Sequence, residues 1–331
     1  MEAGGGTSAK LVSMVERGAR LRRRVAALII AAVGTVGLTG CMGPDLTGMV
    51  DDIGVVLSGK PGVDDVETIY QNGFDSGKKV IFKVRMAADA TTAQSVEVAA
   101  ALDQESGDEF DGYDQNFSLN MPDRTITIID RTNSDIMAER TPRLLALASA
   151  PSRSWLIWES DSVPATDGDR LRMVEPQSDP FESLSAVRAE FGSESLLVEM
   201  TETTSVTWHV SFPFSEQGQA RLESVFQPIR DTARRITIAG DQVSNYFAVV
   251  PDGPDKVGLI RESIERIGTT TADPWQFTWA VGSDPTGAYD SSAGGVISVG
   301  GCDYDPDSEV QLTQEAENTQ DQLRTIYDTC N

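Results

Sequence analysis

The feature that most constrains the fold is an order of strand and helix patterns that occurs twice along the chain. Alternating apolar and polar residues indicate strands, and apolar residues at i, i+3, i+4 and i+7 indicate helices. In residues 80–159 the patterns follow the order β-α-β-β-α-β, and the same order returns in residues 206–280. Leu222 and Ile229, for example, share one face of a predicted helix. The repeated order predicts two structural units of the same kind.

Threonines inside the predicted strands indicate the kind of sheet. Thr125 and Thr127 alternate with isoleucines in residues 124–129, and Thr237 lies between two isoleucines in residues 235–239. This alternation is typical of antiparallel strands with one solvated face, whereas strands of a doubly wound parallel sheet are almost continuously apolar. We therefore predict an α+β fold of two tandem domains that look like ferredoxin-like β-α-β-β-α-β domains, each with its helices on one face of an antiparallel sheet.

Each predicted closing strand carries two tryptophans. Trp155 and Trp158 are an odd number of positions apart, so one should face the helices and the other the open side of the sheet. Trp275 and Trp279 are an even number apart and should share a face, for which we expect the core. An interface role for these tryptophans is the alternative, since exposed Trp anchors many interfaces.

The segments outside the two copies are polar and rich in glycine and proline, as linkers and tails are. They divide the chain into six predicted regions: a signal segment in 1–40, a tether with one short helix in 41–62, the first ferredoxin-like domain in 63–160, a linker in 161–190, the second domain in 191–282, and a polar tail with a helix in 283–331.

The N-terminal segment has three parts in a fixed order. Arginines 22–24 precede an uncharged apolar run in residues 25–38, and Leu38-Thr39-Gly40-Cys41 follows. The run is shorter than the roughly 20 apolar residues that span a bilayer. A basic start, a short apolar run and small residues are typical of a signal peptide. An uncleaved anchor or a buried helix is the alternative.

This segment resembles the signal peptide and lipobox of bacterial lipoproteins. The resemblance implies export, cleavage before Cys41 and a diacylglyceryl group on the sulfur of Cys41. Two acyl chains give stable anchoring where a single chain gives only marginal binding. The expected location is therefore the extracytoplasmic face of the cell membrane, with the lipid on Cys41 as the membrane contact.

The remainder of the chain is strongly acidic. The chain has 27 Lys and Arg against 51 Asp and Glu, and residues 1–40 hold six of the basic and two of the acidic ones, which leaves a net charge of −28 for residues 41–331. Such a surface repels nucleic acid, so we expect no nucleic-acid partner. It favours a solvated domain, with binding of cations or a basic partner as the alternative.

Cys302 and Cys330 remain when Cys41 carries lipid. In an oxidising compartment we expect them to form a disulfide, worth about 3–4 kcal/mol in the loop-entropy estimate. Two free thiols, or a catalytic or metal-binding pair, are the alternatives. The chain has one histidine, so soft metal ligands are scarce.

Asp303, Asp305 and Asp307 alternate in an acidic segment that resembles a calcium-binding loop. The EF-hand pattern requires glycine where Ser308 stands and glutamate where Gln314 stands. These aspartates are therefore weak calcium candidates, a solvated turn before a helix is the alternative, and we expect no other cofactor.

The sequence offers little for catalysis. His209 lies in the middle of a predicted strand, and neither a G-x-S-x-G elbow nor a Walker A or G-x-G-x-x-G loop occurs. We predict a non-catalytic binding or scaffold module at the cell envelope, with an envelope protein as its partner. The alternatives are a solute-binding lipoprotein that delivers a ligand to a membrane transporter, and an envelope hydrolase that uses carboxylates.

Overall fold

The computed structural model describes residues 44–73, 77–122, 124–130, 136–149, 155–163, 168–174, 179–202, 206–282, 288–302 and 311–329. Residues 44–331 form one compact unit, here called the body. In the described part of the chain, no helix is long and apolar enough to cross a membrane.

Strands come in pairs along the described chain, and helices separate the pairs. The strands are β1 (Val63–Gly73), β2 (Gly77–Met86), β3 (Asp114–Met121), β4 (Arg124–Asp130), β5 (Trp155–Val163), β6 (Gly168–Val174), β7 (Leu196–Thr201), β8 (Thr207–Phe212), β9 (Ala233–Ala239), β10 (Gln242–Val250), β11 (Trp275–Gly282) and β12 (Tyr289–Val299). The helices are α1 (Thr47–Ser58), α2 (Thr92–Ser106), α3 (Ile136–Ser149), α4 (Pro180–Phe191), α5 (Glu216–Phe226), α6 (Lys256–Ile267) and α7 (Gln314–Tyr327), with a short 3₁₀ helix, η1 (Arg230–Thr232).

All the described strands belong to one twelve-stranded mixed sheet in which strand order equals chain order. The two strands of each pair are antiparallel, as in β1–β2 and β3–β4. Neighbouring pairs join through parallel contacts, as in β2–β3 and β4–β5, and each parallel step contains a helix, as such crossovers usually do. The body is thus a repeat of strand, strand and helix, about 40 residues long, and each unit contacts its neighbours in the way of solenoid proteins.

The predicted pair of ferredoxin-like domains is wrong. The predicted order is present, for example as β2-α2-β3-β4-α3-β5, but each strand pairs with the next along the chain. The two strands joined through each of the helices α2 to α6 are parallel neighbours, so the sheet does not divide into two antiparallel sheets. The predicted linker 161–190 contains β6 and most of α4, so the sheet continues through it. The predicted tether 41–62 contains the short helix α1, as expected. Threonine alternation correctly indicated a solvated face, but it does not report whether the neighbouring strand is parallel.

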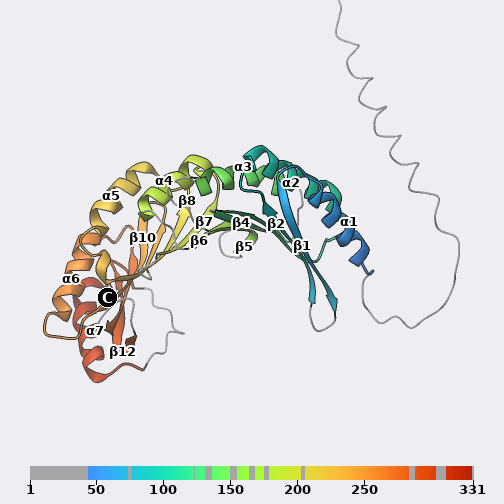
Figure 1. Cartoon of the computed structure of the whole chain (residues 1–331). Coiled ribbons are helices and arrows are strands. Elements are labelled where there is room, and N and C mark those ends of the chain that lie inside the picture. Colours follow the sequence, from blue (N-terminus) through green and yellow to red (C-terminus); the bar gives the residue numbers. More distant parts are fainter. Residues whose placement is uncertain are drawn as a thin grey trace, which may run out of the picture. The chain divides into compact units, whose positions relative to one another are not determined.

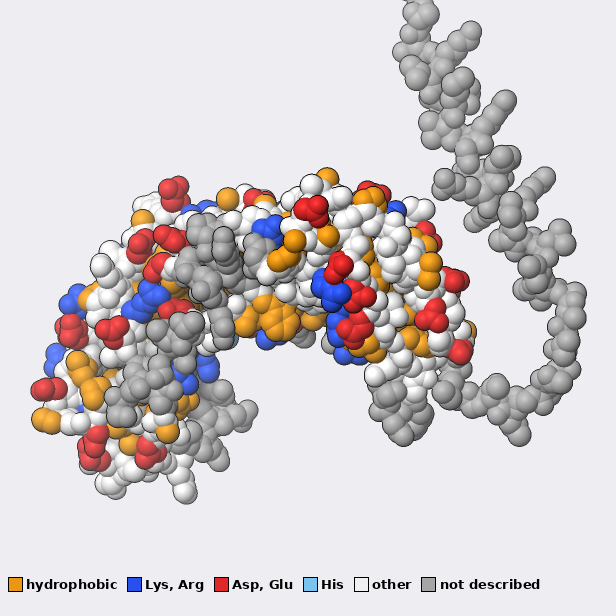
Figure 2. All heavy atoms as spheres, in the orientation of Figure 1, with side chains coloured by type: hydrophobic (Ala, Val, Ile, Leu, Met, Phe, Trp, Pro, Cys, Tyr) orange, Lys and Arg blue, Asp and Glu red, His pale blue; other side chains and the backbone are white. Residues whose placement is uncertain are grey.

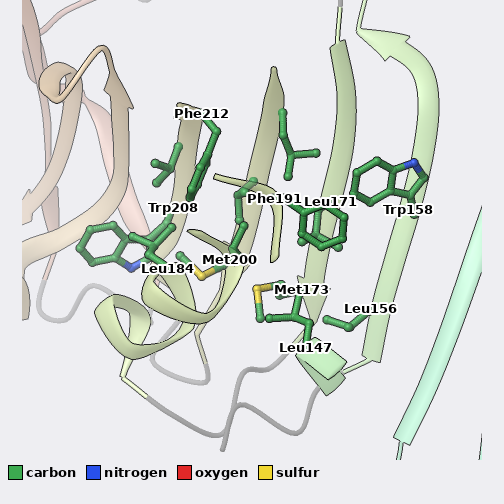
Figure 3. Close-up of a cluster of buried hydrophobic side chains, with 14 of the residues drawn as sticks. Leu147, Leu156, Trp158, Leu171, Met173, Leu184, Phe191, Met200, Trp208 and Phe212 are labelled. Carbon is green, nitrogen blue, oxygen red and sulfur yellow. The ribbon is translucent and has the colours of Figure 1, made fainter. Parts of the chain in front are cut away.

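The helices lie on one face of the sheet, and the core fills the space between them and the strands (Figure 1). Large aromatic side chains connect successive units: the Phe226 ring on α5 lies 5.5 Å from Trp208 on β8 and 6.0 Å from Tyr246 on β10. Trp158 on β5 packs 5.0 Å from Phe191 on α4 (Figure 3). Because these contacts cross from one unit to the next, the core is continuous along the body.

The tryptophan predictions are confirmed. Trp158 is fully buried beneath the helices, whereas Trp155, three residues before it on β5, is 50% exposed on the opposite face. Trp275 and Trp279 on β11 are both buried in the core. Alternation along a strand therefore places these side chains as expected, although the sheet around them differs from the predicted one.

Side chains cap the first turns of two helices. Thr91 caps α2 in a capping box: its hydroxyl accepts the Gln94 N–H at 3.3 Å, and the Gln94 side chain accepts the Thr91 N–H at 2.7 Å. Ser215 caps α5, where its hydroxyl accepts the Gly218 N–H at 2.9 Å. These side chains bind N–H groups that the first helical turn leaves without partners.

Candidate binding face of the sheet

The side of the sheet without helices, here called the open face, carries side chains in rows that cross the strands in register. One row, here called the polar row, passes through all twelve described strands. Its members are Glu67, Lys83, Ser118, Thr127, Ile157, Arg172, Glu199, His209, Thr237, Asn245, Gln276 and Ser298. Eleven of these twelve are polar, so the row is a line of hydrogen-bonding groups that Ile157 alone interrupts.

Neighbouring members of the polar row bind one another. Lys83 Nζ lies 3.0 Å from Glu67 Oε1, and the Ser118 and Thr127 hydroxyls are 3.1 Å apart. Farther along, Asn245 Nδ2 donates to Gln276 Oε1 at 2.8 Å. These cross-strand pairs hold the side chains in place before any ligand arrives, which lowers the ordering cost of binding.

A second row runs beside the polar row and contains Trp155 on β5 and Phe247 on β10. Trp155 Nε1 donates to the Thr127 hydroxyl at 3.2 Å, and Trp155 is 50% exposed. The Phe247 ring meets Tyr289 edge-on at 5.5 Å, and Tyr289 is 40% exposed. Five strand spacings of about 4.8 Å separate β5 from β10, so these aromatic groups lie roughly 24 Å apart across the sheet.

The centre of the open face holds two arginines and two glutamates from β5, β6 and β7. Arg170 lies 3.3 Å from Glu159 and 3.6 Å from Glu199. Arg172 lies 3.2 Å and 3.7 Å from the same two carboxylates. The four charges balance, and the Glu159 side chain is only 13% exposed. Such a partly buried network is fixed in geometry far better than isolated surface ion pairs are.

His209 lies at the side of this network. Its Nε2 is 4.0 Å from Glu199 Oε1, and its side chain is about two-thirds buried. Burial lowers the pKa of His209; Glu199 opposes this effect, and Arg235 and Arg170 add to it. The imidazole is therefore neutral near pH 7, where it contributes hydrogen-bonding capacity and no charge.

Charge on the remaining surface is mixed. Figure 2 shows acidic and basic side chains interspersed on the visible face of the molecule. A hollow of about 710 Å³ beside α4 is lined by Arg188, Phe214 and Asp241, among others. Its polar groups bind the protein itself: Arg188 Nε donates to the Phe214 carbonyl at 2.8 Å, and Asp241 accepts the Ser215 N–H at 2.7 Å. These bonds support the fold, which leaves the open face as the better candidate for binding.

The predicted lipid site at Cys41 lies outside the described residues, as do the weak calcium candidates Asp303, Asp305 and Asp307. Within the described ranges, no group of three or more His, Cys, Asp or Glu side chains is arranged to hold a metal ion. Both predictions therefore remain predictions.

The predicted disulfide also remains a prediction, because Cys330 lies outside the described residues. The backbone next to the two cysteines is nevertheless paired. Gly300 N donates to the Tyr327 carbonyl and Thr329 N donates to the Gly301 carbonyl, each at 2.9 Å. The residues directly before Cys302 and Cys330 therefore lie side by side.

Sequence reasoning did not find Glu159, Arg170, Arg172 and Glu199 as a group. The signal was present, because Arg170 and Arg172 alternate with apolar residues as strand residues do. The surrounding prolines and aspartates favoured a linker instead, so β6 was not expected.

Comparisons with known proteins add no relative. No protein-family model matches the chain, and neither a curated protein nor a solved structure matches it significantly.

Proposed function

We propose that this chain is a lipid-anchored, non-catalytic binding protein at the extracytoplasmic face of the cell membrane, and that an envelope protein docks on the open face. The observation that carries the proposal is the half-exposed Trp155 beside a polar row that crosses every described strand. Tryptophan is strongly enriched among the residues that dominate interface energies. A row of ordered donors and acceptors around it supplies specificity.

The arrangement of charge supports binding better than chemistry. The acids and bases at the centre of the open face neutralise one another, since Arg170 and Arg172 each contact Glu159 and Glu199. Each of these charged groups is therefore already bound within the protein. The same pairs give an approaching protein a fixed pattern of charge against which to align.

The expected anchor is consistent with a module that works at the membrane. Helix α1 begins at Thr47, six residues after Cys41, so a lipid on Cys41 would be attached close to the first helix along the chain. A diacylated cysteine would hold the body at the membrane without a spanning helix. A partner would then be an envelope protein that reaches the same surface.

The test is gentle detergent extraction of the native protein, followed by mass spectrometry of whatever co-purifies. We expect a stoichiometric protein partner with the wild type, its loss in Cys41→Ser, and its loss in Trp155→Ala with the lipid retained. Arg221→Ala, an exposed change on α5, is the matched control and should keep the partner. A bound small molecule with no protein partner, or equal recovery with Trp155→Ala, would contradict the proposal.

A further inference from the structure

The two edges of the sheet are finished differently. At the last strand, α7 binds the outer backbone groups of β12: Gln320 Oε1 accepts the Val296 N–H at 2.8 Å, and Asp328 Oδ1 accepts the Ser298 N–H at 3.2 Å. Arg324 Nε donates to the Val296 carbonyl at 3.4 Å. Exposed edges invite further strands, and natural proteins often cover them in this way. The C-terminal edge is therefore closed to another strand.

At the first edge, no side chain of α1 binds the backbone of β1 among the described residues. In the part of the chain that the structure describes, β2 is the one strand paired with β1, and α1 packs against β1. β1 is eleven residues long, and the outer side of residues 64–71 within it offers an extended line of backbone donors and acceptors. A long edge of this kind is a ready template for strand addition.

Within the described chain, helix α1 has a neighbouring helix on one side only. Consecutive helices from α1 to α6 contact one another, and α1 contacts α2 but has no helix before it in the described chain. Val55 and Val56 on α1 are 72% and 37% exposed, the only exposed large aliphatic side chains besides Ile326 among the described residues. Exposed apolar groups on the first helix of the described repeat point to a further unit that packs there.

Charge at this end favours association of like with like. Residues 44–86 contain seven acidic and five basic residues, a net charge of −2 within a chain of net charge −24. Repulsion between copies is therefore modest at this edge, since low net charge promotes association.

The sequence of β1 is self-complementary in one antiparallel register. If Thr68 pairs with Thr68 of a second copy, Glu67 lies opposite Ile69 and Asp65 lies opposite Gln71. No two acids then face each other directly, which would be unfavourable. Val66 lies opposite Tyr70, a β-branched and aromatic pair of the kind that stabilises sheets.

We propose that two copies of this chain dock through their β1 edges about a two-fold axis, with the two α1 helices side by side. The axis is perpendicular to the sheet, so both open faces point the same way and form one longer surface. An interface of this type is self-complementary, as two-fold interfaces must be. The proposal stands apart from the lipid on Cys41 and from any partner of the open face.

The test is sedimentation equilibrium of the body, residues 44–331, which contains its whole core, with two opposite substitutions at one position. Ile69→Glu places a carboxylate opposite Glu67 of the other copy twice in the dimer, and we expect at least a tenfold weaker association. Ile69→Lys places an ammonium group there, and we expect association at least as tight as in the wild type. Both variants replace the same apolar side chain beside Ile81, so the monomer loses a similar contact in each.

Circular dichroism checks that both variants keep the fold. A wild-type body that remains monomeric at about 0.1 mM would overturn the proposal, because standard two-fold interfaces associate well below that concentration. Equal dimerisation of Ile69→Glu and Ile69→Lys would also overturn it, since the dimer would then use another surface.

Discussion

Replacement of two tryptophans on one strand should have very different effects on stability. Trp158 and Trp155 are both on β5, but Trp158 is fully buried beneath the helices and Trp155 is half exposed on the open face. Trp158 also contacts the Phe191 ring at 5.0 Å and lies under the Arg140 guanidinium at 4.8 Å. Trp158→Ala therefore removes packing between neighbouring repeat units, whereas Trp155→Ala removes a surface contact.

The size of each loss follows from burial. A buried Trp removes up to about 250 Å² from water, which at about 25 cal/mol per Å² sets an upper limit near 6 kcal/mol. Measured core truncations of this kind cost about 3–5 kcal/mol. We predict that Trp158→Ala lowers the free energy of unfolding by about 4 kcal/mol and Trp155→Ala by about 1 kcal/mol. The loss at Trp155 is smaller because the side chain is only half buried and its one hydrogen bond, to Thr127, is partly exposed.

The assay is urea denaturation of the body followed by far-ultraviolet circular dichroism, which does not depend on the replaced fluorophores. The two variants should differ by about 3 kcal/mol in the free energy of unfolding, a large part of the 5–15 kcal/mol typical of natural proteins. Equal losses, or a greater loss for Trp155→Ala, would refute the assignment of the two faces of the sheet.

Three further outcomes are expected. Thr91→Ala should lower the free energy of unfolding by about 1 kcal/mol through loss of the α2 capping box, with Thr92→Ala as a near-neutral control in the same denaturation assay. The free energy of unfolding should fall as the pH is lowered from about 8 to about 5.5. The pKa of His209 is lowered in the folded protein, so as the pH falls past the ordinary histidine pKa of 6.5, the unfolded state takes up the proton before the folded state does. His209→Gln should remove this part of the fall. Gln320→Ala should leave the Val296 N–H on the edge of β12 without its side-chain partner, so that copies aggregate through this edge and light scattering increases on storage. Asp321→Ala, on the exposed side of α7, should not increase the scattering.

The local elements could be predicted because strand and helix periods are properties of neighbouring residues. The helices at 92–106, 136–149, 216–226 and 256–267 agree with their sequence patterns, and so do the strands next to them. The pairing of strands could not be predicted in the same way, since it depends on contacts between distant segments. Two domains and one continuous sheet can therefore share the same local patterns.

Two of the strands that sequence reasoning missed, β6 and β12, have polar or glycine-rich sequences. β12 includes Gly294 and Gly295, which favour loops, yet a Cβ atom on Gly295 would come within 2.4 Å of the Trp279 ring. Glycine is needed there because the indole packs directly on the strand. The centre of the open face was missed for a related reason: β6 lies in a segment with the composition of a linker, so its arginines could not be placed opposite Glu159 and Glu199.

The most direct test of the account is site-specific photo-crosslinking in the intact cell. A photoreactive residue at Thr201, exposed on the open face, is compared with one at Ala220, exposed on α5. Docking on the open face predicts one defined protein adduct from position 201 and none from position 220. The same adduct from both positions, or from position 220 alone, would contradict binding through the open face.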